Sequence, residues 1–108
     1  MNILVIDDER DFPFANLQAR SFEDGLRALT DFKWDKLYLD HDLGDAQGRT
    51  GYDIVKFMEA NPEHRPGEVV IVTANPVGRK NIEAGLRAMG FERVSQSIWK
   101  NTEEVLYF

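Results

Sequence analysis

Apolar runs alternate with amphipathic segments along the chain, and the two patterns predict different elements. Residues 3–6, 37–39 and 69–72 are apolar almost throughout. Such runs are typical of strands buried on both faces, as in a parallel sheet covered by helices. Together with weaker patterns between them, they predict five strands, over residues 2–6, 17–20, 36–40, 68–73 and 93–98, of which the second is a short edge strand.

Helical spacing of apolar residues predicts three helices between these strands. Ser21 and Asp24 form a capping box before apolar residues at positions i, i+4 and i+7, which indicates a helix start. Pro76 suits the first turn of a helix and Gly90 a C-terminal cap. The predicted helices span residues 22–32, residues 51–60 and the segment from Pro76 to Gly90. This alternation predicts one α/β domain over residues 1–108, with a parallel sheet.

Polar side chains follow three of the predicted strands at the point where each strand ends. They are Asp7 and Asp8, then Asp40, His41 and Asp42, and finally Thr73 and Asn75. The carboxyl ends of parallel strands share one edge of the sheet, where ligands bind in such folds. Four carboxylates this close cannot all stay ionised without a cation, and oxygen ligands suit Mg²⁺ or a similar hard ion such as Mn²⁺. The pattern therefore predicts a metal-dependent phosphate site.

The residues after the fourth predicted strand have two interpretations. Thr73 and Asn75 precede a helix, whose free amides and dipole favour anions, so they would hold phosphoryl oxygens opposite the metal. The alternative is that both are ordinary N-terminal capping residues. Arg79, one turn into the same helix, reaches either a phosphate or the solvent.

His41 lies between two acidic residues, and its role also has two interpretations. Alternation along the strand end points its side chain away from Asp40 and Asp42, which suits a structural or surface residue. If the loop turned the ring back, the neighbouring acids would favour its protonated form, which suits a general acid. Asp42 itself supplies a carboxylate that can act as a metal ligand or as a general base.

Composition narrows the classes of partner. The formal net charge of −6 argues against extended nucleic-acid binding, but a small phosphate ester or one nucleic-acid end held through a metal is compatible with it. The chain has no cysteine, which excludes disulfides, zinc–thiolate sites and thiol catalysis. No apolar stretch approaches transmembrane length, so we expect a cytoplasmic protein that does not contact membranes.

The acidic segments resemble those of a known family. Residues 2–9 are similar to the opening of a two-component receiver domain, the domain of response regulators. Asp40 then matches the phosphate-accepting aspartate of that family, and Thr73 matches its hydroxyl position. A narrower resemblance, to the cyclic-phosphate processing receiver domains, is carried by residues 7–10, 39–43 and 75–79. The resemblance implies a flavodoxin-like sheet of five parallel strands in the order 2-1-3-4-5.

The resemblance also implies roles for these residues. Asp8 would ligate the metal directly, and Asp7 directly or through a water molecule. Asp40 would be a ligand and a nucleophile, and the backbone carbonyl of Asp42 would complete the ligand set. The catalytic candidates are Asp40, His41, Asp42 and Thr73, and the substrate-binding candidates are Arg10, Thr73, Asn75 and Arg79.

The chain departs from the receiver pattern in three places. A receiver has a lysine at the end of its fifth strand, but here the corresponding residues 94–99 contain no lysine, and the first that follows is Lys100. The segment between Ile6 and Asn16 contains Pro13 and is too short for the first receiver helix. The terminal helix is at most a stub. These departures favour a pseudo-receiver over conventional aspartyl-phosphate switching.

A missing first helix and a short last helix would leave one face of the sheet thinly covered. Aromatic residues flank both gaps: Phe12, Phe14, Trp34, Trp99, Tyr107 and Phe108. They would either fold over the sheet as a lid or form a patch that drives association, since aromatic side chains bury much area. We expect a homodimer or a protein partner at this face.

Two functions follow from the sequence. The first is Mg²⁺-assisted processing of a phosphate ester, by hydrolysis of a cyclic or terminal nucleotide phosphate, with Asp40 or water as the attacking group. Such an activity would make the domain a metal-dependent phosphoesterase. The alternative is a non-enzymatic receiver or pseudo-receiver that acts as a phospho-acceptor or as a protein-binding regulatory module. The acidic cluster favours the first, and the lost lysine and truncated helices favour the second.

Overall fold

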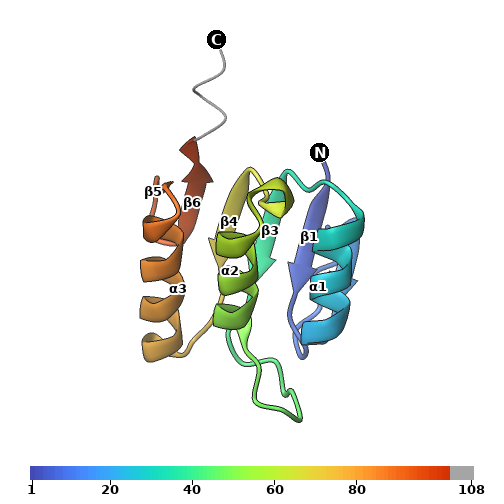
Figure 1. The fold of residues 1–108 in the computed structure, drawn as a ribbon. Coiled ribbons are helices and arrows are strands. Elements are labelled where there is room, and N and C mark those ends of the chain that lie inside the picture. The colour runs from blue at the N-terminus through green and yellow to red at the C-terminus, as the bar shows by residue number, and fades with distance from the viewer. Residues whose placement is uncertain (103–108) are drawn as a thin grey trace.

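Strands and helices alternate along the chain much as the sequence predicts. The computed structural model describes residues 1–102, and Figure 1 shows how their elements are arranged. The strands are β1 (Ile3–Ile6), β2 (Leu17–Ala19), β3 (Lys36–Leu39), β4 (Glu68–Ile71), β5 (Phe91–Arg93) and β6 (Ile98–Asn101). The helices are α1 (Phe22–Asp31), α2 (Gly51–Ala60) and α3 (Pro76–Ala88), with a 3-10 turn, η1 (Pro62–His64), after α2.

The six strands form one sheet in the order β2-β1-β3-β4-β6-β5. The first four strands in this order are parallel to one another, which confirms the predicted order 2-1-3-4 and a mostly parallel, receiver-like architecture. Beyond β4 the direction changes, because β6 pairs antiparallel with β4 and β5 pairs antiparallel with β6. The prediction of five strands, all parallel, is therefore wrong at this end of the sheet.

The single strand predicted over residues 93–98 is a hairpin instead. Residues 94–97, which are mostly polar, form a largely exposed turn between β5 and β6. The side chain of Trp99 in β6 is 1% exposed and lies opposite Val69 of β4. Because β6 is the more apolar of the two strands, it takes the inner place beside β4 and leaves the polar β5 at the edge.

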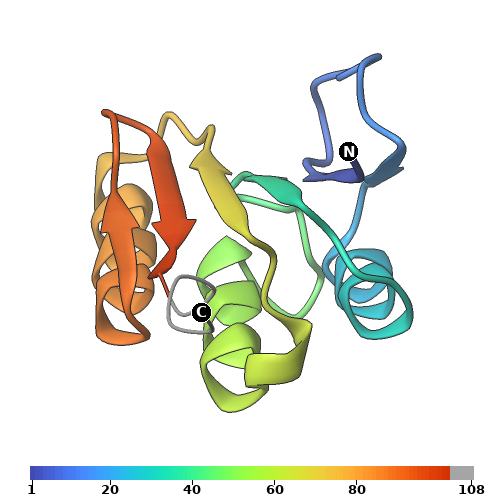
Figure 2. The same ribbon diagram turned by 90° about the horizontal axis from the view of Figure 1, so that it is seen from above.

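The three α-helices lie on one face of the sheet, as the view along the strands shows (Figure 2). One row of core residues crosses the sheet in register through Leu4, Leu37, Val69 and Trp99. The facing helices contribute buried residues at helical spacing, among them Ile54, Met58, Ile82 and Leu86. This helical layer fixes the strands whose carboxyl ends carry the acidic residues.

A side chain caps the start of each α-helix. Ser21 accepts a hydrogen bond from the amide of Asp24 at 3.1 Å, as predicted for α1. Thr50 and Asp53 form a complete capping box at α2, and Asn75 caps α3. None of the helices in the described part of the chain has the length and apolar character of a membrane span.

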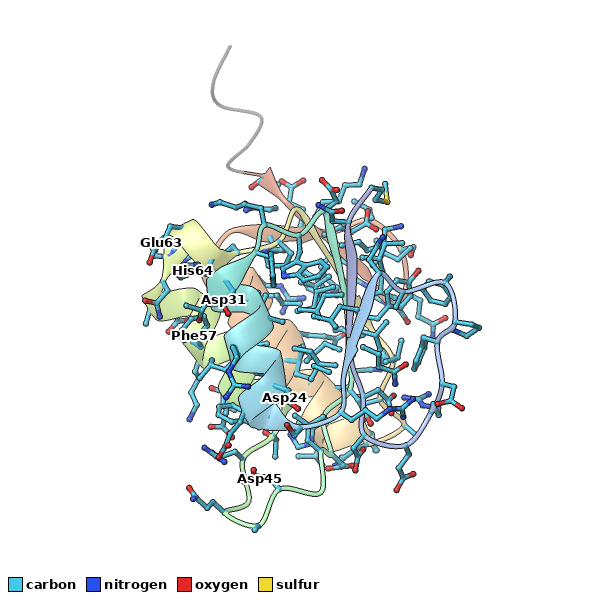
Figure 3. The ribbon with its side chains drawn as sticks, turned by 90° about the vertical axis from the view of Figure 1, so that its right-hand side faces the viewer. Asp24, Asp31, Asp45, Phe57, Glu63 and His64 are labelled. Atoms are coloured by element: carbon cyan, nitrogen blue, oxygen red, sulfur yellow. The ribbon has the colours of Figure 1, made fainter. Side chains whose placement is uncertain are left out.

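The opposite face of the sheet is covered by a loop, which projects away from the helices in Figure 3. Residues 7–16 contain no helix, so the predicted absence of the first receiver helix is confirmed. The rings of Phe12 and Phe14 lie over Tyr38 of β3, with centroids 6.1 and 5.0 Å from its ring. These two residues form part of the predicted lid.

Two other aromatic residues do not belong to this lid, and their assignment to the thin face is wrong. The indole of Trp99 is buried on the helical face, because its position in β6 points it there. Trp34 packs against the same core, and its indole N–H donates to the carbonyl of Ala28 at 2.8 Å. Tyr107 and Phe108, and the predicted terminal helical stub, lie outside the described residues.

Candidate functional site

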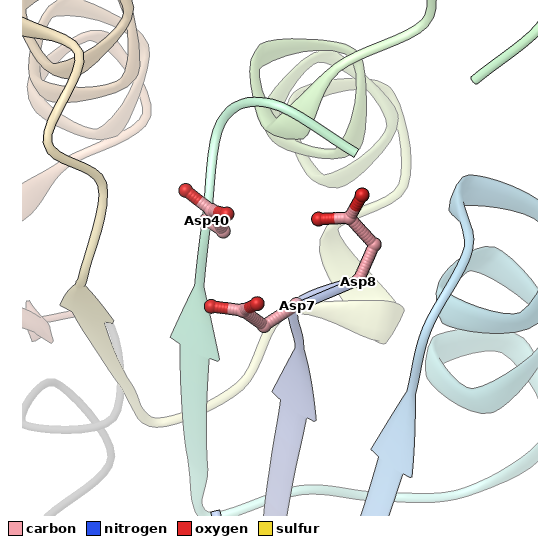
Figure 4. A group of neighbouring side chains, drawn as sticks. All are labelled: Asp7, Asp8 and Asp40. Atoms are coloured by element: carbon pink, nitrogen blue, oxygen red, sulfur yellow. The ribbon is translucent and has the colours of Figure 1, made fainter. Parts of the chain in front are cut away.

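Three carboxylates meet at the edge of the sheet where β1 and β3 end (Figure 4). Asp7 and Asp8 follow β1, and Asp40 follows β3 directly. Because these two strands are paired in register along their whole length, the residues that follow them lie side by side. One oxygen of each carboxylate lies within 4.8 Å of an oxygen of the other two.

The side chain of Asp7 is fully buried, and its oxygens accept three hydrogen bonds and form one ion pair. Oδ1 accepts from the backbone amides of Glu9 at 3.0 Å and Arg10 at 2.9 Å. Oδ2 accepts from Nε of Arg10 at 3.0 Å and lies 2.8 Å from its Nη2. The Asp7 carboxylate therefore holds the start of the loop that follows β1.

Asp8 differs from Asp7 in having a carboxylate without a partner. No hydrogen bond or ion pair joins this carboxylate to another residue within residues 1–102. Gly44 lies beside it with φ of +60°, and a Cβ added at Gly44 would lie 2.9 Å from Oδ2 of Asp8. The positive φ favours glycine at this position. The Asp8 oxygens are thus available to a ligand.

The Asp40 side chain is 14% exposed, and its surroundings shift its pKa in opposite directions. Burial is the main cause that raises the pKa of Asp40 above its ordinary value, and the negative charge of Asp7 raises it further. The backbone amide of His41, which donates to Oδ1 at 2.8 Å, lowers this pKa, as do Arg10 and the Thr73 hydroxyl. The fold therefore disfavours the ionised form of Asp40 relative to its protonated form.

Arg10 brings a positive charge into the cluster. Its Nη2 lies 3.8 Å from Oδ1 of Asp40 and donates to the carbonyl of Val72 at 2.6 Å, in addition to its contacts with Asp7. The guanidinium thus connects the ends of β1, β3 and β4. The sequence suggested that Arg10 binds the substrate. In the structure, Arg10 also contacts the acidic cluster.

A pocket of about 350 Å³ opens beside the cluster. Its lining consists of Glu9, Arg10, Asp40, Asp42, Thr73, Ala74 and Asn75. Five of these were singled out from the sequence: Asp40, Asp42, Thr73 and Asn75 because they follow predicted strands, and Arg10 through the family resemblance. Asp7 and Asp8 lie next to it through their contacts with Arg10 and Asp40.

Thr73 and Asn75 contribute both to the pocket and to the start of α3. Thr73 is buried, and its Oγ1 accepts a hydrogen bond from the amide of Asn75 at 3.1 Å. Oδ1 of Asn75 accepts from the amides of Val77 and Gly78 at 3.1 and 3.0 Å. The capping interpretation of Asn75 is thus correct, while its Nδ2 lies 3.4 Å from both oxygens of Asp42 across the pocket.

The fourth predicted carboxylate, Asp42, stands apart from the other three. Its side chain is 66% exposed, and its Oδ1 lies 2.9 Å from Nδ1 of His41. The His41 ring packs against the backbone of Gly78, where an added Cβ would lie 2.3 Å from the ring Cγ. His41 does not line the pocket, which agrees with its structural interpretation. The prediction that its side chain points away from Asp42 is wrong, because the ring contacts that carboxylate and supports it from behind.

Two other basic residues lie away from the pocket. The guanidinium of Arg79 donates to the carbonyl of Ile71 at 3.2 Å and to that of Gln96 at 3.5 Å, and so ties the β5–β6 turn to β4. Lys100 lies opposite Glu68 at the start of β4, on the far edge of the sheet from the acids. Neither residue lines the pocket beside Asp40.

One residue that holds the site together was missed by the sequence argument. Nε2 of Gln18 donates to the carbonyls of Asp7 at 3.2 Å and Arg10 at 2.6 Å, and Oε1 of Gln18 accepts from the amide of Phe12 at 3.1 Å. Gln18 belongs to β2, and nothing in its sequence context indicates that it clamps the loop. Glu9, which lines the pocket, was also missed, although it directly follows the acidic pair.

The donor set of the three carboxylates fits a hard divalent cation. Oxygen is the ligand atom that Mg²⁺ and Mn²⁺ prefer, and all three side chains offer it. Two oxygens on one Mg²⁺ lie at most about 4.2 Å apart. The observed limit of 4.8 Å is close to that spacing, so small side-chain movements would bring the oxygens into range.

The arrangement of acids, hydroxyl and sheet edge agrees with the comparison to known families. Over residues 2–88 the chain matches the family described as "Cyclic-phosphate processing Receiver domain". The match contains every residue that lines the pocket and ends before the β5–β6 hairpin, where the sheet departs from the receiver order. No curated protein and no solved structure matches the chain. The chain belongs to the cyclic-phosphate processing receiver domain family.

Proposed function

We propose that this domain processes a phosphate ester with the help of Mg²⁺ or Mn²⁺. The substrate would be a cyclic or terminal phosphate, carried by a nucleotide or by one end of a nucleic acid. The observation that carries the proposal is the pocket in which Asp40 faces Thr73 and Asn75, with the acidic cluster directly behind it. A phosphoryl group in this pocket would have cation ligands on one side and hydrogen-bond donors on the other.

The cation would be held by Asp7, Asp8 and Asp40, and by the backbone carbonyl of Asp42 if the receiver pattern applies. When bound, it would neutralise negative charge on a phosphoryl oxygen. The partner-free carboxylate of Asp8 and the raised pKa of Asp40, of which burial is the main cause, both favour a site that gains from a cation.

The donors for phosphoryl oxygens would come from the segment between β4 and α3. The first free amides of α3 are not available, because Asn75 accepts from the amides of Val77, Gly78 and Arg79. The backbone amide of Ala74 remains. The Thr73 hydroxyl and Nδ2 of Asn75 interact with Asp40 and Asp42, and would turn from these carboxylates to the phosphoryl oxygens. The amide of Ala74 has no acceptor among residues 1–102, which leaves it free for an anion.

Two nucleophiles suit this site. A carboxylate oxygen of Asp40 can attack phosphorus directly, or Asp42 can act as general base toward a water molecule in the pocket. His41 would position Asp42 through the 2.9 Å contact between Nδ1 and Oδ1, while the rest of its ring stays packed on Gly78. Both routes require Asp40, either as the attacking group or as a cation ligand.

A panel of phosphate esters that includes 2′,3′-cyclic nucleotides tests the proposal. The purified domain should release product only with Mg²⁺ or Mn²⁺, and Asp40→Asn should lower the rate by about a hundredfold or more, since it removes a group on which the chemistry depends. Asp42→Asn should also lower the rate. Product release by phosphate-specific detection or chromatography is the measurement.

The matched control is Asp31→Asn, which makes the same chemical change on an exposed residue at the far end of α1 (Figure 3). This variant should keep the wild-type rate. A complete panel without turnover, or turnover that survives Asp40→Asn, would contradict the proposed reaction.

A phospho-acceptor function is the second candidate, and one observation favours it. Asp40 lines the pocket beside the cationic side chain of Arg10, and Nη2 of Arg10 lies 3.8 Å from Oδ1 of Asp40. Arg10 would take the place of the missing receiver lysine. Incubation with acetyl phosphate and Mg²⁺, followed by mass spectrometry, would detect a phosphorylated Asp40. Labelling without turnover of any ester would favour this second function.

A further inference from the structure

Arg10 is a cationic side chain that contacts the acidic cluster, and its contacts overlap with those that a metal ion would need. Both nitrogens Nε and Nη2 lie within 3.0 Å of Oδ2 of Asp7. The same Nη2 approaches Oδ1 of Asp40. The guanidinium thereby neutralises part of the charge of two of the three carboxylates, those of Asp7 and Asp40.

The Asp7 carboxylate cannot serve Arg10 and a metal ion at once without losing contacts. Its Oδ1 already accepts from two backbone amides, and its Oδ2 accepts from Nε of Arg10 and forms an ion pair with Nη2. A divalent ion at contact distance from these oxygens would also be close to the guanidinium, and like charges at such a distance repel strongly in a partly buried site. Arg10 and a divalent cation would therefore compete for this carboxylate.

We propose that Arg10 is a resident counter-cation, which a divalent cation displaces from Asp7 and Asp40 when it binds. This inference rests on the proposed function, because it concerns the cation of the same site. Arg10 is suited to leave, since its side chain is 52% exposed and its backbone is held independently by Gln18. The loop therefore keeps its conformation while the guanidinium moves.

After its displacement, the guanidinium would bind the phosphoryl group of the substrate. Arg10 lines the pocket together with Thr73, Ala74 and Asn75, so a short movement keeps it at the wall of the same cavity. A guanidinium presents planar pairs of donors that match phosphoryl oxygens. The exchange makes binding ordered: the cation binds first and releases Arg10, and the phosphate binds second.

Metal titration of arginine variants tests the competition without any assay of turnover. Arg10→Gln removes the competing charge, so it should bind Mg²⁺ about tenfold more tightly than the wild type by isothermal calorimetry. Arg27→Gln is the matched control, because Arg27 forms an exposed ion pair with Asp24 on α1 and should leave the affinity unchanged. Equal or weaker Mg²⁺ binding by Arg10→Gln would overturn the competition.

A second readout uses the wild-type protein and so does not depend on the folding of a variant. The Nε–H of Arg10, which is hydrogen-bonded to Asp7, should give a protected NMR signal in EDTA. Saturating Mg²⁺ should abolish this protection, and inorganic phosphate added with Mg²⁺ should restore it at a new chemical shift. A signal that is unchanged by saturating Mg²⁺ would overturn the displacement.

The two proposals fail in different ways in this experiment. If neither wild type nor Arg10→Gln binds Mg²⁺, the metal site itself fails, and both proposals fall. If Mg²⁺ binds both proteins equally and Asp40→Asn abolishes binding, the metal site stands and only the role of Arg10 as a competing cation is overturned. Phosphate binding without Mg²⁺ that equals binding with it would overturn the order of binding.

Discussion

Without a bound metal, the fold disfavours the ionised form of the Asp40 carboxylate. Burial raises the pKa of Asp40 above its ordinary value of 3.8. The native state therefore binds this proton more tightly than the unfolded chain does. The contribution of Asp40 favours folding below the ordinary pKa and is lost as the pH rises through the raised pKa.

Replacement of this carboxylate should stabilise the metal-free protein at neutral pH. Asp40→Asn should raise the melting temperature in EDTA at pH 7 by a few degrees, given that about 1 kcal/mol corresponds to roughly 4–8 °C for a domain of this size. The amide oxygen of Asn can still accept the hydrogen bond from His41. The difference should narrow at pH 4, where the wild-type carboxyl is more often protonated, and calorimetry at both pH values is the measurement.

Mg²⁺ should reverse the order of the two proteins, because only the wild type retains all three carboxylates and is stabilised by the ion. Asp31→Asn should follow the wild type at each pH and in each buffer. A lower melting temperature for Asp40→Asn in EDTA at pH 7 would mean that the contacts of this carboxylate outweigh its burial.

At the scale of single residues, the sequence predicted that the three acidic side chains meet, but not that the Arg10 side chain lies among them. Asp7, Asp8 and Asp40 follow strands that pair in register, so their meeting depends only on the sheet. The position of the Arg10 side chain depends on a loop without periodicity, held by Gln18 from a neighbouring strand. No local pattern encodes such a long-range clamp.

The first turn of α3 depends on one side chain. Asn75 satisfies the amides of Val77 and Gly78, so Asn75→Ala should lower the stability by about 1 kcal/mol and the melting temperature by several degrees. Asn81→Ala is the control, because Asn81 is exposed within the same helix and alanine has the higher helix propensity. If thermal unfolding shows that the two variants are equally stable, the Asn75 cap does not contribute to the stability of the protein.

The elements that could be predicted are those with a strong local signal. The capping side chain of Ser21 and the ring of Pro76 mark helix starts, and both helices begin next to them. The β5–β6 hairpin has no such signal, because residues 94–97 lack the Asn-Gly or Asp-Gly pair of a tight turn. Which strand lies inside was decided by the burial of Trp99, a tertiary effect.

The molecule as a whole has helices on one side of its sheet and a loop on the other. Val5, Tyr38, Val70 and Ile98 form a row in register across four strands. Val5 and Val70 stand outside the helix-side core, because they alternate with its residues along the strands. Phe14, which covers part of this row, is 52% exposed.

Self-association through this face stays a prediction. Sedimentation at micromolar concentration should show a dimer that Phe14→Lys dissociates, with little change in the melting temperature of the subunit. If Phe12 and Phe14 suffice as a lid, the wild type is a monomer and Phe14→Lys lowers its melting temperature instead. The second result would contradict association.

The position of β6 matters while the chain is being made. A nascent chain that ends after α3 has no partner for the outer edge of β4, whose residues Val69, Val70 and Ile71 are apolar. An unpaired edge of this kind can pair with another chain and lead to aggregation. Because a short turn joins β5 and β6, their hairpin can form within about 1–10 μs of its release from the ribosome. The strand synthesised last among those described therefore protects the newly made sheet.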